Sequence, residues 1–189
     1  MKKTDVVHDQ FFTKKSVAKS CLLQLRKFIE DDLFFVEPSA GSGNFLNLLP
    51  RDSRLGIDIA KNHPDVVEQD FLDWQTQKDS NRICFVGNPP FGKNSSLAVK
   101  FFNHAAKFGD TIAFILPRTF RKSSIQSRLN LNFHLVFEEV LETNSFQLIS
   151  GEDYSVPTTF QVWQKKEHKR RVAKQNNTHP DRDWETICF

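Results

Sequence analysis

The chain of 189 residues has a formal net charge of +3, and its length suits one domain with a sizeable core. No apolar run approaches the roughly 20 residues of a membrane-spanning helix, and the polar start from Met1 to Asp5 lacks the apolar stretch of a signal peptide. The cysteines Cys21, Cys84 and Cys188 are scattered and odd in number, which argues against a disulfide framework or a zinc site, so we expect a reducing, cytoplasmic location without membrane contact.

The N-terminal part of the chain predicts an extended segment and then a helix. Residues 8–13 have the composition of an extended or loop segment, while residues 14–31 place apolar side chains at helical spacing. Thr13 or Ser16 is the expected N-cap of this helix, because both side chains can accept a hydrogen bond from a free backbone N–H.

A buried strand and a glycine turn follow. Residues 33–36 are apolar without polar alternation, as is typical of a strand covered on both faces of a parallel sheet. The chain then continues as Glu37-Pro38-Ser39-Ala40-Gly41-Ser42-Gly43, and we expect a helix from residue 44 to about residue 49. Strand, glycine turn and helix together let the backbone approach a ligand and present N–H groups to it. The alternative is that both glycines only form a tight turn.

An acidic residue stands at the end of the second predicted strand, residues 55–59. Asp58 lies 21 residues after Glu37, at a distance from the glycine turn where an acid is placed to bind ribose hydroxyls. The alternative is a capping acid at the start of a loop; with the glycine turn in place, we favour the ribose role.

A short third strand is expected at residues 66–67, and two candidate adenine contacts follow it. The Asp70 carboxylate is placed to accept the amino hydrogens of an adenine, and the Phe71 ring to pack on its face. As an isolated pair these residues are ordinary, and we expect nearby Trp74 to be a packing residue.

The fourth predicted strand, residues 83–87, ends in Asn88-Pro89-Pro90-Phe91. The two prolines fix φ and remove two backbone N–H donors, while their carbonyls remain as acceptors beside the Asn88 side-chain oxygen. A planar amino group bonded to these acceptors would be held in place, with the Phe91 ring available for stacking. An enzyme that alkylates an exocyclic amine needs these parts, although a Pro-Pro pair after a strand is more often an ordinary turn.

The remaining chain alternates helices and strands before a polar end. We expect helices at residues 96–108, capped by Ser95 or Ser96, and at residues 123–130, with strands at residues 111–116, 133–141 and 158–164. Residues 142–157 are expected to form a long loop, and such loops are often functional. A basic, polar tail follows residue 166, and its last residues, 184–189, have a strand-like composition.

This series of strands and helices predicts a doubly wound α/β sheet. Five signals occur in a fixed order at its strand ends: Phe11-Phe12-Thr13, the glycine turn, Asp58, Asp70-Phe71 and Asn88-Pro89-Pro90-Phe91. In this order the chain resembles the class I S-adenosylmethionine-dependent methyltransferases, in particular those that act on the N6 amino group of adenine. The resemblance covers about residues 9–166, so we expect residues 1–166 to form the catalytic domain and residues 167–189 to form a basic, polar tail. It implies a Rossmann-like sheet of seven strands, mostly parallel with an antiparallel last strand.

The resemblance also implies a set of site residues. The Glu37 carboxylate would lie near the ammonium group of S-adenosyl-L-methionine. Asn88 and the Pro89 carbonyl would accept hydrogen bonds from the target amine, and Phe91 would stack on the target base. The implied catalytic residues are Asn88, Pro89, Pro90 and Phe91, and no metal ligand is implied. The implied cofactor-binding residues are Phe12, Thr13, Glu37, Ser39, Ala40, Gly41, Gly43, Asp58, Ile59, Asp70, Phe71 and Asn88.

Basic side chains are expected to contact a nucleic-acid substrate. Lys93, Arg118, Arg121 and Lys122 follow the ends of the fourth and fifth strands, where the ligand crevice of such sheets lies. Basic clusters suit a phosphate backbone, while the alternative is solvated surface charge. The same two possibilities hold for the basic residues after residue 164.

Four functions fit these patterns. DNA is the favoured substrate for adenine-N6 methylation, and structured RNA is the second. An enzyme of the same fold acting on a guanine amino group or a protein glutamine is the third, and a catalytically inactive binding subunit is the fourth. The sequence contains no target-recognition domain of any size, so a separate recognition subunit remains part of the hypothesis.

Overall fold

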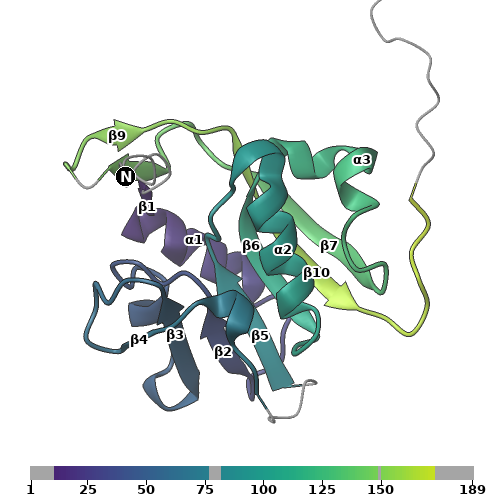
Figure 1. The fold of residues 1–189 in the computed structure, drawn as a ribbon, viewed down its shortest axis with the longest axis horizontal. Coiled ribbons are helices and arrows are strands. Elements are labelled where there is room, and N and C mark those ends of the chain that lie inside the picture. The colour runs from purple at the N-terminus through teal and green to yellow at the C-terminus, as the bar shows by residue number, and fades with distance from the viewer. Residues whose placement is uncertain (1–10, 77–81, 149, 173–189) are drawn as a thin grey trace, which may run out of the picture.

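The computed structural model describes residues 11–76, 82–148 and 150–172 and shows an α/β fold built on one large sheet (Figure 1). Within these residues the sheet has seven strands in the order β4-β3-β2-β5-β6-β10-β7, parallel except for β10, which is antiparallel to both neighbours. The strands are β2 (Phe34–Glu37), β3 (Arg54–Asp58), β4 (Val66–Glu68), β5 (Ile83–Gly87), β6 (Thr111–Pro117), β7 (Phe133–Val140) and β10 (Thr158–Lys165). The predicted fold class is therefore confirmed.

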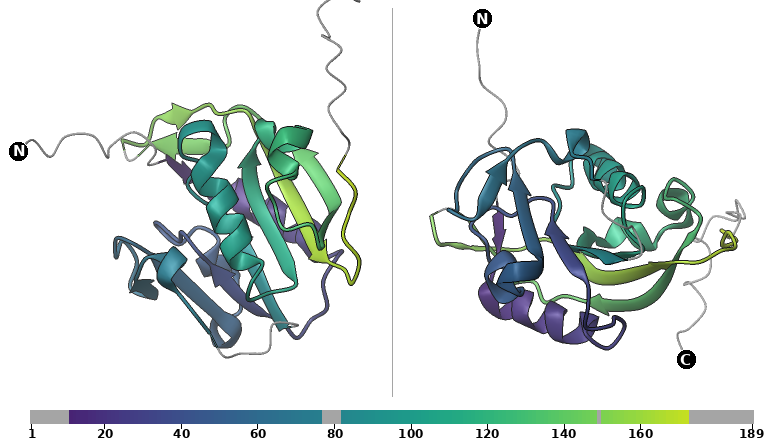
Figure 2. Two further views of the ribbon diagram at one scale, coloured as in Figure 1. Left: turned by 45° about the vertical axis from the view of Figure 1, so that its right-hand side comes forward. Right: turned by 90° about the horizontal axis from the view of Figure 1, so that it is seen from below.

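Helices cover both faces of this sheet. Along β6, Phe114 and Leu116 point into a core formed with α2 (Ser96–Ala105), while Ala113 and Ile115 point to the opposite face, toward α1 (Lys15–Leu25). Figure 2 shows α1 on one side of the sheet, and α2 with α3 (Ser123–Gln126) on the other. This two-sided burial explains why the strand sequences are apolar throughout.

A small antiparallel sheet lies at one end of the large one, in the order β1-β8-β9. It is formed by β1 (Phe11–Thr13), β8 (Phe146–Leu148) and β9 (Asp153–Tyr154). The expectation of an unstructured loop over residues 142–157 was therefore wrong. The strands have two or three residues each, too few for a recognisable alternation, and β8 pairs with a segment more than 130 positions away.

The helix expected after the glycine turn is replaced by a single 3₁₀ turn, η1 (Leu46–Leu48). Pro50 disfavours the helical conformation of the residue before it, and Leu49 accordingly has an extended ψ of 153°. The predicted helix over residues 44–49 was wrong, and the glycine turn has no α-helix N-terminus behind it.

The other helices are shorter than expected. α1 ends at Leu25, since the acids at residues 30–32 would oppose the dipole at the end of a longer helix. Its N-cap is Lys14, which makes no side-chain capping bond, so the expectation of a Thr13 or Ser16 cap was wrong. α3 spans only four residues of the segment predicted to be helical.

The chain after β10 continues to pack on the domain through Arg170. Its backbone N–H donates to the Leu131 carbonyl (2.8 Å), Nε to the Phe133 carbonyl (2.8 Å) and Nη2 to the Gln126 carbonyl (2.6 Å). The guanidinium also lies over the Trp163 ring, 5.3 Å from its centroid. Residues 173–189, with the strand-like end at 184–189, lie outside the described residues. No helix in the described part of the chain is long and apolar enough to cross a membrane.

We expect Arg170→Ala to lower the free energy of unfolding by about 2–3 kcal/mol. The change removes two charged hydrogen bonds to backbone carbonyls and the contact with Trp163. Denaturant unfolding measures the loss. Exposed Lys169→Ala is the matched control and should change stability by less than about 0.5 kcal/mol. Equal stability of the two variants would contradict the anchoring role of Arg170.

Candidate functional site

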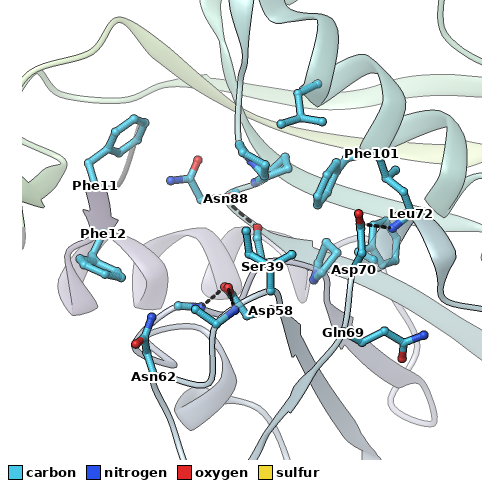
Figure 3. A pocket seen from close by; sticks show the side chains of 18 residues that line it. Phe11, Phe12, Ser39, Asp58, Asn62, Gln69, Asp70, Leu72, Asn88 and Phe101 are labelled. Carbon is cyan, nitrogen blue, oxygen red and sulfur yellow. Dashed lines mark hydrogen bonds between the residues drawn. The ribbon is translucent and has the colours of Figure 1, made fainter. Parts of the chain in front are cut away.

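A pocket of about 270 Å³ lies where β2, β3 and β5 end, and Figure 3 shows Ser39, Asp58 and Asn88 around its centre. Ligands of open α/β sheets bind at this edge. A smaller cavity of about 40 Å³ adjoins it and shares Phe11, Phe12, Ser39, Gly41 and Asn88 with it.

The two cavities bring together most of the predicted site residues. The larger is lined by Phe12, Ser39, Gly41, Asp58, Ile59, Asp70, Phe71, Asn88, Pro89 and Pro90, and the smaller adds Thr13, Glu37 and Ala40. Gly43 and Phe91 line neither cavity. Phe11, Pro38 and Ser42, which belong to the predicted motifs without being named as site residues, also line the cavities. Lining residues that the sequence patterns did not indicate are Ala60, Asn62, Gln69, Leu72, Leu97 and Phe101 in the larger cavity, and Asn44 and Phe45 in the smaller. Many of these are sequence neighbours of the predicted residues.

The glycine turn needs its glycines for conformation and for close contacts. Gly41 has a φ of +50°, and a Cβ there would lie 2.9 Å from the Phe12 ring. Gly43 has a φ of +78°, and a Cβ there would lie 2.8 Å from the His63 ring. Gly41 therefore leaves room for the Phe12 ring against the turn, whereas Gly43 leaves room for the His63 ring.

Asp58 fixes the turn to the end of β3. Its Oδ2 accepts a hydrogen bond from the Gly41 N–H (2.8 Å), and its Oδ1 accepts one from the Ala60 N–H (3.0 Å). A carboxylate has about four lone-pair directions, so Asp58 can accept two further hydrogen bonds from hydroxyl groups in the pocket. The spacing predicted such a role for this residue.

Three buried polar atoms around the smaller cavity have no hydrogen-bond partner in the described part of the chain. They are Thr13 Oγ1, Glu37 Oε2 and Asn88 Oδ1. Leaving such a group unpaired costs about 1–3 kcal/mol. A ligand with hydrogen-bond donors, above all a cation, would pair with them.

Glu37 is the most perturbed of these groups. It is 3% exposed, and its burial raises the pKa of the carboxyl well above the ordinary value. A hydrogen bond from the Leu46 backbone opposes this rise, the nearby charge of Asp58 adds to it, and Arg54 lowers it. Burial is the largest of these effects, so the site disfavours the Glu37 charge until a cation balances it.

The Asn-Pro-Pro segment is held against the glycine turn by one hydrogen bond. The Ser39 hydroxyl donates to the Asn88 carbonyl at 2.9 Å. This bond fixes the Asn88 backbone and leaves its side-chain oxygen unpaired. Pro89 follows at the end of β5 and lines the larger cavity, so its carbonyl is a second candidate acceptor beside Asn88.

Phe91 occupies a different position from the one expected for a stacking residue. Its side chain is 9% exposed and lies edge-on to the Phe11 ring at 5.5 Å. The Phe91 carbonyl accepts hydrogen bonds from the Leu97 and Ala98 N–H groups (3.1 and 3.2 Å). The Phe91 backbone carbonyl thus binds free N–H groups at the start of α2.

The side-chain cap expected from Ser95 or Ser96 at this helix is absent. Ser95 stands at the N-cap position with a φ of 60°, and its hydroxyl bonds to Thr119 Oγ1 at 2.7 Å. This bond joins the loop after β5 to the loop after β6.

The predicted adenine contacts differ in exposure. Asp70 is exposed, and its Oδ1 accepts the Leu72 N–H (2.8 Å), which leaves Oδ2 available. The Phe71 ring is 1% exposed and packs against Phe101 (5.2 Å between centroids), so it supports the pocket wall from within the core. Ile59 is 70% exposed and gives the pocket an apolar surface. Trp74 is a core residue, as expected.

The four predicted nucleic-acid contacts lie on the two joined loops. Lys93 belongs to η5 (Lys93–Ser95), Arg118 and Arg121 to η6 (Arg118–Arg121), and Lys122 follows directly; all four side chains are exposed. Arg121 forms an ion pair with Glu138 (2.9 Å), which reduces its free charge. Within the described residues no group of three or more potential metal ligands occurs.

Several solved structures with a similar fold are methyltransferases. The chain is similar to a Pyrococcus horikoshii protein whose assignment as an RNA methyltransferase is provisional: the two are 14% identical, with a TM-score of 0.63, and the match covers 87% of this chain and 92% of that one. The chain has the fold of the methyltransferases.

Two further methyltransferases have the same fold. The methyltransferase subunit of a type I restriction-modification system from Streptococcus thermophilus is 21% identical, with a TM-score of 0.61 over 84% of this chain and 45% of that subunit. Magnesium protoporphyrin IX methyltransferase from Synechocystis PCC 6803, solved with bound S-adenosylmethionine, is 11% identical, with a TM-score of 0.57 over 80% of this chain and 79% of that one. The chain thus spans less than half of the restriction-modification subunit. No protein-family model and no curated protein matches the sequence.

We expect Glu37→Gln to stabilise the ligand-free protein at pH 7 by about 1–2 kcal/mol. The pKa of this carboxyl is higher in the folded state than in the unfolded chain, where it is about 4.3. The folded state therefore binds more protons, and wild-type stability falls as the pH rises from 4 through the folded pKa.

Urea unfolding of wild type and variant at pH 4 and pH 7 measures this effect, and the gain should vanish at pH 4. Exposed Glu68→Gln is the control and should change little at either pH. A stability difference between Glu37→Gln and wild type that is the same at both pH values would contradict the shifted pKa.

Proposed function

We propose that this protein transfers a methyl group from S-adenosyl-L-methionine to the N6 amino group of adenine in nucleic acid, with DNA as the favoured substrate. One observation carries the proposal: the Asn88 side-chain oxygen is a buried, unpaired acceptor beside the glycine turn, at the edge of the sheet where ligands bind, and Pro89, with its backbone acceptor, lines the same pocket. The methyltransferase fold supports the chemistry.

The residues of the two cavities fit the cofactor. Glu37 Oε2 is unpaired and buried, as suits an acceptor for the ammonium group, and Thr13 Oγ1 lies at the same cavity. Asp58 has lone pairs for the ribose hydroxyls, and Asp70 Oδ2 is available to the adenine amino group. When bound, S-adenosylmethionine supplies an electrophilic methyl group on its sulfonium.

The Asn88 and Pro89 acceptors would orient the target amine. The lone pair of an adenine amino nitrogen is conjugated with the ring and is therefore a poor nucleophile. Two hydrogen bonds from the amino hydrogens to Asn88 Oδ1 and the Pro89 carbonyl favour a more pyramidal nitrogen, whose lone pair points at the methyl group. These bonds strengthen as positive charge develops on the nitrogen, which stabilises the transition state more than the ground state.

A base in a duplex must leave the stack before it can reach these acceptors. Phe91 is the proposed stacking partner of the flipped base. Its ring now packs on Phe11, outside the pocket lining. The Phe91 ring must therefore turn toward the pocket when a base enters.

Structured RNA is the second candidate substrate. The likeness to a Pyrococcus horikoshii protein assigned as an RNA methyltransferase, over 92% of that chain, favours it. The described residues form a single domain without a separate recognition module, and a small enzyme can recognise RNA by its shape.

Methyl-labelled cofactor tests the proposal. The protein is incubated with matched pools of double-stranded DNA, single-stranded DNA and structured RNA, which are then digested to nucleosides. We expect label in N6-methylated deoxyadenosine from the DNA pool. Label from the RNA pool alone would select the second candidate, and label in another base would overturn the adenine assignment. Cofactor binding without label would indicate a missing recognition partner, a protein substrate or an inactive binding subunit.

We expect Asn88→Ala to lower the methyl-transfer rate by about 10²–10³-fold, because it removes one of the two acceptors of the target amine. Cofactor affinity, measured by calorimetry, should stay close to that of wild type. Asn88→Asp keeps an acceptor of the same shape and should retain more activity than Asn88→Ala. Wild-type turnover in Asn88→Ala would remove Asn88 from the catalytic residues.

We expect charge reversal of Arg118 and Lys122 together to weaken nucleic-acid binding and to reduce its salt dependence. The slope of log K against log salt concentration is negative, and each lost phosphate contact should reduce its magnitude by about 0.9. Reversal of Arg121 alone should have a smaller effect, because Arg121 is already paired with Glu138. Binding at a series of salt concentrations measures the slope, and an unchanged slope in the double variant would exclude these contacts.

A further inference from the structure

Charge is divided unevenly between two parts of the molecule. Residues 30–76, which contain β2, β3 and β4, include ten acidic and three basic residues. Residues 93–137, which contain α2, β6 and α3, include one acidic and seven basic residues. All seven basic side chains are exposed, and four of them are the predicted contacts on the two loops after β5 and β6. The other three are Lys100, Lys107 and Arg128.

Lys100, Lys107 and Arg128 form one surface, here called the α2 stripe. Lys100 lies on α2, and Lys107 lies in the turn directly after the helix, where its N–H donates to the His104 carbonyl (3.1 Å). The two lysines are seven residues apart, close to two helical turns, so we place them on the same side. Asn103 stands between them: its Nδ2 donates to the Arg128 carbonyl (2.8 Å), and its Oδ1 accepts the Asn130 N–H (2.8 Å). These two bonds hold the segment with Arg128 beside the helix.

The charge of the α2 stripe is not neutralised by its surroundings. Within the described residues none of its three side chains forms an ion pair. The one acid of this region, Asp110, is paired with Lys165 at 2.9 Å. Asp70 is the N-cap of η3 (Phe71–Asp73) and Asp73 is its last residue, and both lie near His104 of α2. The acidic side chains near the stripe are therefore on the side of the proposed cofactor pocket.

We propose that the α2 stripe binds the phosphate backbone of a nucleic-acid duplex next to the nucleotide that enters the pocket. This inference rests on the proposed function. α2 starts directly after η5, which carries Lys93, and its first turn lines the pocket through Leu97, so the stripe runs along the helix away from the pocket. At 1.5 Å per residue, the two lysines are about 10 Å apart, which matches the axial rise of about three nucleotides. The duplex would thus lie over α2 and avoid the acidic residues of β3 and β4.

A triple variant tests the stripe against a matched control. Lys100→Gln/Lys107→Gln/Arg128→Gln removes three charges from the stripe. Lys19→Gln/Arg26→Gln/Lys27→Gln removes two lysine charges and one arginine charge from exposed positions on the α1 side, across the sheet. Both variants change the net charge equally. All six side chains are exposed, so both proteins should fold, which thermal melting checks.

The readout is the affinity for one duplex sequence, prepared as DNA and as RNA, over a series of salt concentrations. In the stripe variant we expect the magnitude of the log–log salt slope to fall by about 2–3 and the affinity at low salt to fall at least tenfold for whichever duplex binds. Cofactor affinity should not change. The control variant should keep the wild-type slope and affinity.

The outcomes separate this inference from the proposed function. A stripe variant with the wild-type slope, equal losses in both variants, or a wild-type protein that binds neither duplex would each overturn the stripe. If wild type methylates adenine and the stripe variant binds the duplex as wild type does, only the proposal of the α2 stripe is overturned. A loss in the stripe variant, together with label in another base, would support the stripe and overturn the adenine assignment.

Discussion

The site depends on the way the Asp58 carboxylate holds the glycine turn. A helix after this turn would have directed its first N–H groups toward the ligand, but the segment forms only a 3₁₀ turn that ends before Pro50. Two side-chain interactions take over the positioning. Asp58 binds the Gly41 and Ala60 amides, and Ser39 binds the Asn88 carbonyl. The ends of β2, β3 and β5 are thereby fixed to one another around the pocket.

The same region contains polar groups that the fold alone does not satisfy. Glu37 is buried with an unpaired oxygen, and Thr13 and Asn88 face the same small cavity with unpaired atoms. Each of them lowers the stability of the ligand-free fold, as is common where a sequence departs from the rules of good packing at a functional site. The aromatic core around Phe71, Phe85 and Phe114 supplies the compensating stability.

The sequence predicted what depends on local patterns. β2, β5 and β6 were recognisable because strands buried on both faces are apolar throughout. Most of the predicted site residues lie around one pocket because the carboxyl ends of parallel strands meet at one edge, while their roles stay a prediction. Features that depend on distant partners were missed. The β1-β8-β9 sheet joins short segments from the two ends of the domain, and it places Phe11 against the Phe91 ring, a contact that no local pattern indicates.

The position of the Asn-Pro-Pro segment in the sheet connects the two charged parts of the molecule. The strand order reverses between β2 and β5, and this switch point opens the crevice in which such sheets bind ligands. On the β2–β4 side, Glu37, Asp58 and Asp70 are acceptors suited to a cationic, hydroxyl-rich cofactor. On the β5–β6 side, exposed cations suit a polyanion. Asn88 follows β5 at this boundary, so in the proposed reaction the methyl group would pass from one ligand to the other beside this residue.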